Sequence, residues 1–129
     1  MADEKIRPRV LLVDDAEDHL AMYSDYLASR GFDVACARDG EAAVEVALKE
    51  TFDIIIVDTV MPKLDGIGLL MVLRNYSKTK RVPMISLSAR SGEEARAAAV
   101  DAGANLAMEK PCSPEELEQT IRVFLRRRE

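Results

Sequence analysis

The sequence predicts an α/β fold, a three-layer, doubly wound (βα)5 unit in which five parallel strands lie between helices. Short runs rich in Val, Ile and Leu alternate along the chain with segments whose apolar residues recur at the helical period. The runs are continuously apolar, as expected for strands that are buried on both faces of a parallel sheet. Their alternation with helical segments favours βαβ units over separate layers of strands and helices.

Two βα units are expected in the first part of the chain. A strand near 9–13 leads into a helix over about 17–30, which stops at Gly31, a residue suited to a helix C-terminus. A strand near 33–36 and a helix over about 40–49 follow. The helical period predicts which side chains face the sheet. They are Leu20, Tyr23 and Leu27 in the first helix, and Ala43, Ala47 and Leu48 in the second.

Three further strands are expected near 53–57, 83–87 and 105–108, with helices over about 66–75 and 92–102 between them. The helix over 66–75 is largely apolar. The helix over 92–102 is rich in alanine, which favours helix formation and leaves a flat surface.

The last helix has the clearest start signal in the chain. Ser113 is expected at the N-cap, Pro114 at the first helical position and Glu116 at the third, which together form a capping box. The apolar residues that follow recur at helical spacing and predict a face that packs against the core. They are Leu117, Ile121, Phe124 and Leu125.

Length and charge restrict the classes of protein to which the chain can belong. With 129 residues it is expected to form one domain, without disulfides or a second module. The formal net charge of −5 argues against a surface that binds nucleic acid. The basic cluster in the last helix is interpreted as a solvated helix end that suits the helix dipole. It comprises Arg122, Arg126, Arg127 and Arg128.

The cysteines, the single histidine and the longest apolar runs exclude several other classes. Cys36 and Cys112 have no CxxC spacing and are interpreted as free thiols in a reducing compartment. His19 is the only histidine, which excludes a cluster of histidine ligands, and it is interpreted as a partly exposed residue of the first helix. No apolar run is long enough to cross a bilayer, and the charged start lacks the apolar segment of a signal peptide. A soluble, cytoplasmic protein is expected.

Four of the apolar runs end on polar residues. Asp14 and Asp15 follow the first strand, Asp58 the third and Ser88 the fourth, while Lys110 lies at the end of the last. In open α/β sheets the ligand crevice lies beyond the carboxyl ends of the strands, so these side chains are expected to converge. An alternative for the acid pair alone is a polar cap for the following helix.

Three carboxylates in one crevice would repel one another unless a cation is present. Magnesium ion prefers oxygen ligands and is usually held by one or two carboxylates together with water and substrate phosphate. A carboxylate can also act as a nucleophile and form an aspartyl phosphate. The pattern therefore predicts a magnesium-assisted phosphoryl-transfer site.

The chain resembles the receiver domains of two-component response regulators, which have the CheY-like form of the flavodoxin-like fold. The matching segments are LLVDDAED, DIIIVDTVMPKLDG, MISLSAR and GANLAMEKP, and the resemblance covers about residues 8–127. It implies a single receiver domain over 1–129 and the strand order 2-1-3-4-5.

The resemblance also implies a role for each site residue. Asp14 and Asp15 match the family's Mg²⁺-binding acids, to which Asp58 and the backbone carbonyl of Val60 would add ligands. Asp58 matches the phosphoacceptor, Ser88 the switch hydroxyl and Lys110 the family's lysine. Four further residues match the loop and the entry to the third helix, namely Met61, Pro62, Asp65 and Gly66.

The function implied is that of a phosphoacceptor in a two-component or phosphorelay system. A sensor histidine kinase or a histidine phosphotransfer protein would supply the phosphoryl group to Asp58. The signal would reach a protein target through the fourth helix, the last strand and the last helix. The resemblance implies a signalling domain, a monomer or weak dimer, whose only chemistry is self-catalysed phosphotransfer and autodephosphorylation, with no direct contact with nucleic acid and no membrane insertion.

Three positions stand out against the family pattern. Ala107 stands where the family usually has Tyr or Phe, so output is expected either through the backbone around Ser88 or with weak coupling. Val60 and Arg90 flank the expected path of attacking water. Because Val60 cannot orient water and Arg90 could bind the phosphoryl group, a persistent aspartyl phosphate is predicted.

Three other classes of function are compared with this one below. The chain could be the receiver part of a longer regulator with a DNA-binding or enzymatic output. An aspartate-nucleophile phosphatase is disfavoured, because its pattern has a second acid where Val60 stands. A flavin or nucleotide binder is disfavoured, because no glycine-rich phosphate loop follows the first strand.

Overall fold

The computed structural model describes residues 7–59, 65–89 and 92–127, and it contains one parallel sheet of five strands in the order β2-β1-β3-β4-β5. The strands are β1 (Arg9–Val13), β2 (Asp33–Ala37), β3 (Ile54–Asp58), β4 (Met84–Ser88) and β5 (Leu106–Glu109). The helices are α1 (Glu17–Ser29), α2 (Gly40–Lys49), α3 (Gly66–Asn75), α4 (Glu93–Ala102) and α5 (Pro114–Arg127). The expected fold class and strand order are confirmed.

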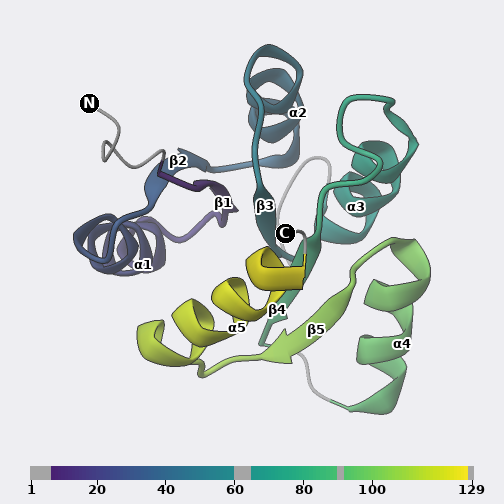
Figure 1. The fold of residues 1–129 in the computed structure, drawn as a ribbon. Helices are drawn as coiled ribbons and strands as arrows, with labels where there is room; N and C mark the ends of the chain where they lie inside the picture. Colours follow the sequence, from purple (N-terminus) through teal and green to yellow (C-terminus); the bar gives the residue numbers. More distant parts are fainter. Residues whose placement is uncertain (1–6, 60–64, 90–91, 128–129) are drawn as a thin grey trace.

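Helices cover both faces of the sheet and form the outer two layers (Figure 1). On one face, α1 and α5 pack against the strands through side chains such as Leu27 and Leu117. On the other face, α2, α3 and α4 pack through Ala43, Leu73 and Ala99. All residues of β3 and β4 are buried, as expected for the centre of a sheet covered on both sides.

The observed strand ends differ slightly from the expected ones. β3, β4 and β5 each begin and end one residue later than the sequence pattern predicts. Asp58 and Ser88 are therefore the last residues of their strands, because the ladder of hydrogen bonds extends to the polar residue that ends each apolar run. The site side chains are consequently anchored on the sheet itself.

One prediction of an inward-facing residue is wrong. Gly40, Ala43 and Ala47 of α2 are buried against the sheet, whereas Leu48 is 45% exposed. Leu48 is one residue beyond Ala47, which turns its side chain about 100° around the helix axis and away from the sheet. A buried stripe of small residues on α2 is too narrow to include it.

Local signals at the helix ends behave as expected. The Ser113 hydroxyl accepts the Glu116 N–H at 3.1 Å and the Glu116 carboxylate accepts the Ser113 N–H at 3.0 Å, which confirms the capping box of α5. Gly31 follows α1 with a φ of 99°, a conformation that favours glycine. The predicted free thiols are also confirmed, with Cys36 exposed and Cys112 buried.

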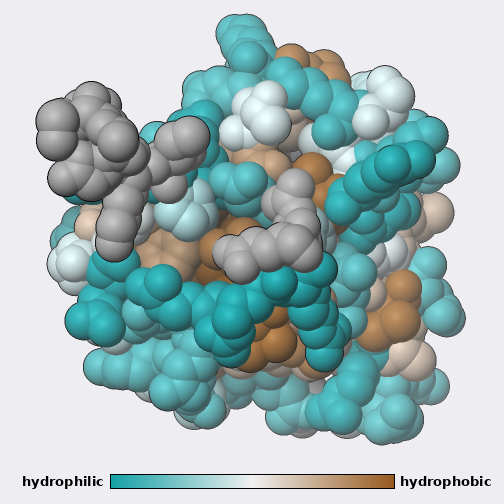
Figure 2. Space-filling model, viewed as in Figure 1, coloured by the Kyte–Doolittle hydropathy of each residue, from teal (hydrophilic) through white to brown (hydrophobic). Residues whose placement is uncertain are grey.

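Hydrophilic residues cover most of the face seen in Figure 2, where apolar residues show in separate patches. Some large apolar side chains are nevertheless exposed on the elements α4, β5 and α5. Val100 is 47% exposed, and Leu106 and Val123 are each 38% exposed.

Candidate functional site

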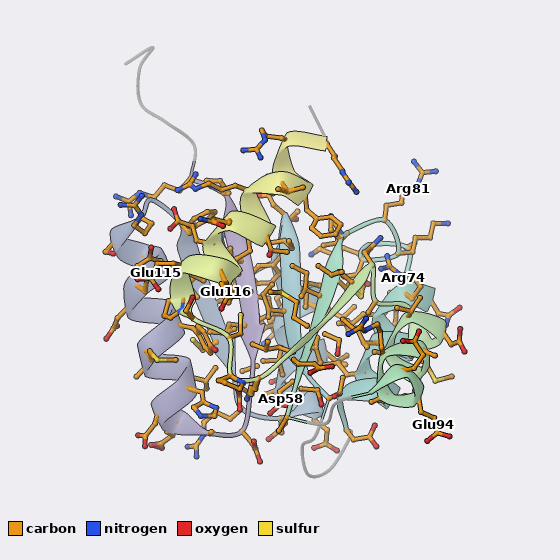
Figure 3. All side chains as sticks on the ribbon, turned by 90° about the horizontal axis from the view of Figure 1, so that it is seen from below. Asp58, Arg74, Arg81, Glu94, Glu115 and Glu116 are labelled. Atoms are coloured by element: carbon orange, nitrogen blue, oxygen red, sulfur yellow. The ribbon has the colours of Figure 1, made fainter. Side chains whose placement is uncertain are left out.

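The site is built at the carboxyl edge of the three central strands, where Figure 3 shows Asp58. In the sheet register, Val13 of β1 pairs with Val57 of β3, so the residues that follow, Asp14 and Asp58, emerge side by side. Ser88 at the end of β4 pairs with Glu109 of β5. The backbone N–H of Lys110 donates to the Ser88 carbonyl at 2.8 Å, which ties the two strand ends together.

The three aspartates that the sequence singles out come together at this edge. Each of Asp14, Asp15 and Asp58 offers one carboxylate oxygen, and these oxygens lie within 4.8 Å of one another. Asp14 and Asp58 are buried, at 2% and 7% exposed, whereas Asp15 is open to solvent. The group is therefore accessible from one side only.

The hydrogen bonds do not support the alternative role of the acid pair as a cap of α1. Asp14 Oδ1 accepts the N–H of Ala16 at 2.9 Å, and Ala16 is the residue that precedes the helical turn of α1. The N-terminus of α1 has no side-chain cap. This bond orients the Asp14 carboxylate within the loop and leaves its other oxygen directed at the site.

Lys110 supplies the positive charge of the site. Its Nζ lies 2.9 Å from Asp14 Oδ2 and 3.6 Å from Asp58 Oδ2, and its side chain is 13% exposed. Burial alone would raise the pKa of Asp14, but the Ala16 N–H and the Lys110 ammonium outweigh burial, so the pKa lies below its ordinary value. Asp14 is therefore an anion at neutral pH.

The donor set fits a hard divalent cation. Among the described residues, three carboxylates face the single ammonium of Lys110, so these groups together carry excess negative charge in a largely buried position. Oxygen ligands with one side open to water match the preference of Mg²⁺, which retains several waters. Val60, whose carbonyl was expected as a further ligand, lies outside the described residues, as do Met61, Pro62 and Arg90.

Two residues at the start of α3 fix how the backbone runs beside the site. A Cβ on Gly66 would overlap the backbone carbonyl of Asp58, so only glycine allows α3 to start this close to the end of β3. The Asp65 carboxylate caps α3 by accepting the Gly68 N–H at 2.8 Å. The match of these two residues to the family pattern therefore has a structural reason.

A small hollow lies beside Ala107. Ala107 is partly buried against the core, and the hollow is lined by Ser86, Ser88, Ala95 and Arg96. Glu109 of the same strand accepts the N–H of Gly92 and pairs with Arg96, both at 3.4 Å. The end of β5 is thus linked to the start of α4.

Sequence reasoning missed the contribution of His19. The side chain is 45% exposed, as expected, but its Nδ1 lies 3.0 Å from Lys110 Nζ and 3.5 Å from Asp14 Oδ2. A cleft of about 750 Å³ next to it is lined by residues of α1 and of the segment after β5, including Tyr23, Pro111 and Pro114. The sequence gives one indication of this role, because His19 lies in the first turn of the helix that follows the acid pair.

A family model for the response regulator receiver domain matches residues 10–122. The chain belongs to this family. It is 41% identical over 121 residues to the transcriptional regulatory protein PrrA of Mycobacterium tuberculosis, covering 94% of this chain and 51% of PrrA. It is 37% identical over 119 residues to the transcriptional regulatory protein CpxR of Escherichia coli, covering 92% of this chain and 50% of CpxR.

Solved receiver structures agree with this assignment. The receiver domain of the Francisella response regulator 1452 matches with a TM-score of 0.88 and 30% identity, covering 95% of this chain and all of that one. Chemotaxis response regulator CheY4 of Vibrio cholerae matches with a TM-score of 0.88 and 32% identity, covering 92% and 99% of the two chains. The expected resemblance is confirmed, and the chain is a receiver domain of two-component signalling.

The receiver chain spans about half the length of the curated relatives it matches. Among the helices of the described residues, none is long and apolar enough to cross a bilayer.

Proposed function

We propose that this receiver domain accepts a phosphoryl group on Asp58 from a phosphohistidine of a sensor histidine kinase or a histidine phosphotransfer protein. The observation that carries the proposal is the acidic group of Asp14, Asp15 and Asp58 with the ammonium of Lys110 between two of its members. Membership of the receiver family supports the same chemistry.

Each site residue has a role in this proposal. An Asp58 carboxylate oxygen attacks phosphorus, and a P–O bond forms as the P–N bond to the donor imidazole breaks. Lys110 neutralises charge on the phosphoryl oxygens, and the Ser88 hydroxyl donates to one of them. Asp14, Asp15 and Asp58 would hold Mg²⁺, with the carbonyl of Val60, and the bound ion would neutralise phosphoryl charge. Holding the reacting groups in place accounts for most of such catalysis.

The proposal is tested by treating the protein with acetyl phosphate and measuring intact mass. We expect the wild type to gain one phosphoryl group in the presence of Mg²⁺ and not in excess EDTA. Asp58→Asn should gain none, while Asp101→Asn, which removes an exposed carboxylate of α4, should react as the wild type does. Labelling of Asp58→Asn at the wild-type rate would refute the assignment.

We further propose that the phosphorylated domain signals through the face formed by α4, β5 and α5. The exposed apolar side chains of Val100, Leu106 and Val123 would contact a protein partner there, and the choice of this face rests on membership of the receiver family. The domain would act in the cytoplasm as a monomer or weak dimer, and its own chemistry would be limited to phosphotransfer and autodephosphorylation.

A second candidate is that the chain, a receiver domain over 1–129 with a core of about 8–127, works as the input part of a longer regulator. The relatives PrrA and CpxR are transcriptional regulatory proteins of which the matched region is about half. In that case the same phosphorylated face would act on a DNA-binding module.

A further inference from the structure

The geometry points to His19 as a positioning residue for Lys110, an inference that rests on the proposed phosphoacceptor function. His19 comes from the first turn of α1, and Lys110 comes from the end of β5, 91 residues later in the chain. Their side chains meet at 3.0 Å between Nδ1 and Nζ. The contact lies at the open side of the site, beside the cleft between α1 and the segment after β5.

The chemistry of the two groups decides the direction of this hydrogen bond. An ammonium has three N–H donors and no acceptor, so the Lys110 side chain can only donate. His19 Nδ1 must therefore accept with its lone pair, and the ring proton lies on Nε2. Asp14 Oδ2 accepts a second donor at 2.9 Å. Asp58 Oδ2 lies 3.6 Å away and forms an ion pair with the ammonium.

The contact matters because a lysine side chain is long and flexible. Holding it in one rotamer costs side-chain entropy. A cation held by the three aspartates would repel the ammonium and compete with it for Asp14. His19 Nδ1 offers an acceptor that is not itself one of the three carboxylates, so Lys110 remains at the site and close to the incoming phosphoryl group. His19 thus acts through Lys110.

Charged groups of several elements lie near the imidazole. Among the described residues, those that face it are Asp14, at 3.5 Å from Nδ1, and Lys110. Glu116 of α5 also lines the adjoining cleft.

Two substitutions of His19 distinguish the loss of the hydrogen-bond acceptor from a change in the shape of the side chain. In His19→Asn the amide oxygen takes the place of Nδ1 and can accept the same hydrogen bond. His19→Leu has the same branched shape without an acceptor, and leucine favours helix more than asparagine, so weaker folding of α1 cannot explain a slower Leu variant. Loss of one hydrogen bond to a charged group corresponds to about a tenfold change in rate.

The first measurement is the rate of modification by acetyl phosphate in Mg²⁺, followed by intact mass. We expect His19→Leu to react about tenfold more slowly than the wild type, and His19→Asn to stay within about twofold of it. A Leu variant that reacts at the wild-type rate, or an Asn variant as slow as the Leu variant, would overturn the inference.

The second measurement needs no phosphorylation, and so separates this inference from the proposed function. Since His19 is the only histidine, an imidazole ¹⁵N spectrum reports on it alone. We expect the Nδ1 resonance of the metal-free protein to shift in Lys110→Met and to stay unchanged in Lys78→Met, which alters an exposed lysine near α2. An unchanged Nδ1 resonance in Lys110→Met would overturn the contact. A clear shift together with a wild-type protein that takes no phosphoryl group would uphold the contact and refute the proposed function.

Discussion

Two regions of the molecule bury carboxylates beside cations, and the described residues around them differ in the number of acids for each cation. Between α1 and α5, Glu118 is 6% exposed and accepts the Tyr26 hydroxyl at 2.7 Å, Arg122 Nε at 2.9 Å and Arg30 Nε at 3.1 Å. At the carboxyl edge of the sheet, Asp14 and Asp58 are similarly buried, and both lie beside the ammonium of Lys110.

The difference shows what separates a structural ion pair from a reactive site. One carboxylate with two guanidinium partners and a phenol accepts three of the about four hydrogen bonds open to its oxygens, and its charge is offset by both cations, so it binds two helices together. Among the described residues, three carboxylates lie beside the single ammonium of Lys110, and together these groups carry negative charge that a cation can neutralise. The choice of cation matters too, because the planar guanidinium holds a fixed geometry whereas the lysine ammonium can move.

The largest effect is expected when the ammonium is removed from the reactive site. Lys110→Met should lower the rate of phosphorylation by acetyl phosphate about 100-fold, because a positioned charge on the phosphoryl oxygens is lost. The same change should tighten Mg²⁺ binding, because the ammonium no longer competes for Asp14. Calorimetric titration with Mg²⁺ measures the second effect, with Lys78→Met as the control. Weaker Mg²⁺ binding in Lys110→Met would contradict this account of the site.

A smaller effect, on stability alone, is expected when the buried carboxylate of Glu118 is replaced. Glu118→Gln should lower the free energy of unfolding by about 2 kcal/mol, because hydrogen bonds to an ionised group are replaced by weaker ones. Phosphorylation of Asp58 should continue at the wild-type rate. Urea unfolding measures the loss, and Glu94→Gln on the exposed side of α4 (Figure 3) should lose almost nothing. A large fall in phosphorylation would show that the two regions are coupled.

The smallest expected effect is a change in how stability depends on pH. The hydrogen bond from Tyr26 contributes most to lowering the pKa of Glu118 to about 2, with burial opposing it and Arg122 and Arg30 adding to it. A lowered pKa in the folded state means that the unfolded chain binds the proton more tightly. The contribution of Glu118 is therefore fully present above its ordinary pKa of 4.5 and is lost as the pH falls through about 2.

Urea unfolding of the wild type and Glu118→Gln at several pH values tests this sign. The difference in unfolding free energy should be largest above pH 4.5 and should shrink towards pH 2. A difference in unfolding free energy that grows on acidification would be evidence against an ionised Glu118 that accepts these hydrogen bonds.

Much of the site could be predicted because it follows from strand ends. Asp14, Asp58, Ser88 and Lys110 were found from the polar residues that end apolar runs, and parallel strands bring such ends to one edge. The contact between His19 and Lys110 could not be found in this way, because it joins residues 91 positions apart. The burial of Glu118 was missed as well, because its neutralising partners Tyr26 and Arg30 lie on a distant helix.

The amino-acid sequence by itself determined the alternation of strands and helices, the helix caps and the residues at the strand ends, because these depend on neighbours within a few positions. Only the tertiary structure decided which charges meet. Packing α1 and α5 side by side brings three hydrogen-bond donors to Glu118, and bringing β1, β3 and β5 into one sheet places three aspartates beside the ammonium of Lys110. The balance of charge in each cluster depends on long-range contacts, and no local pattern contains that information.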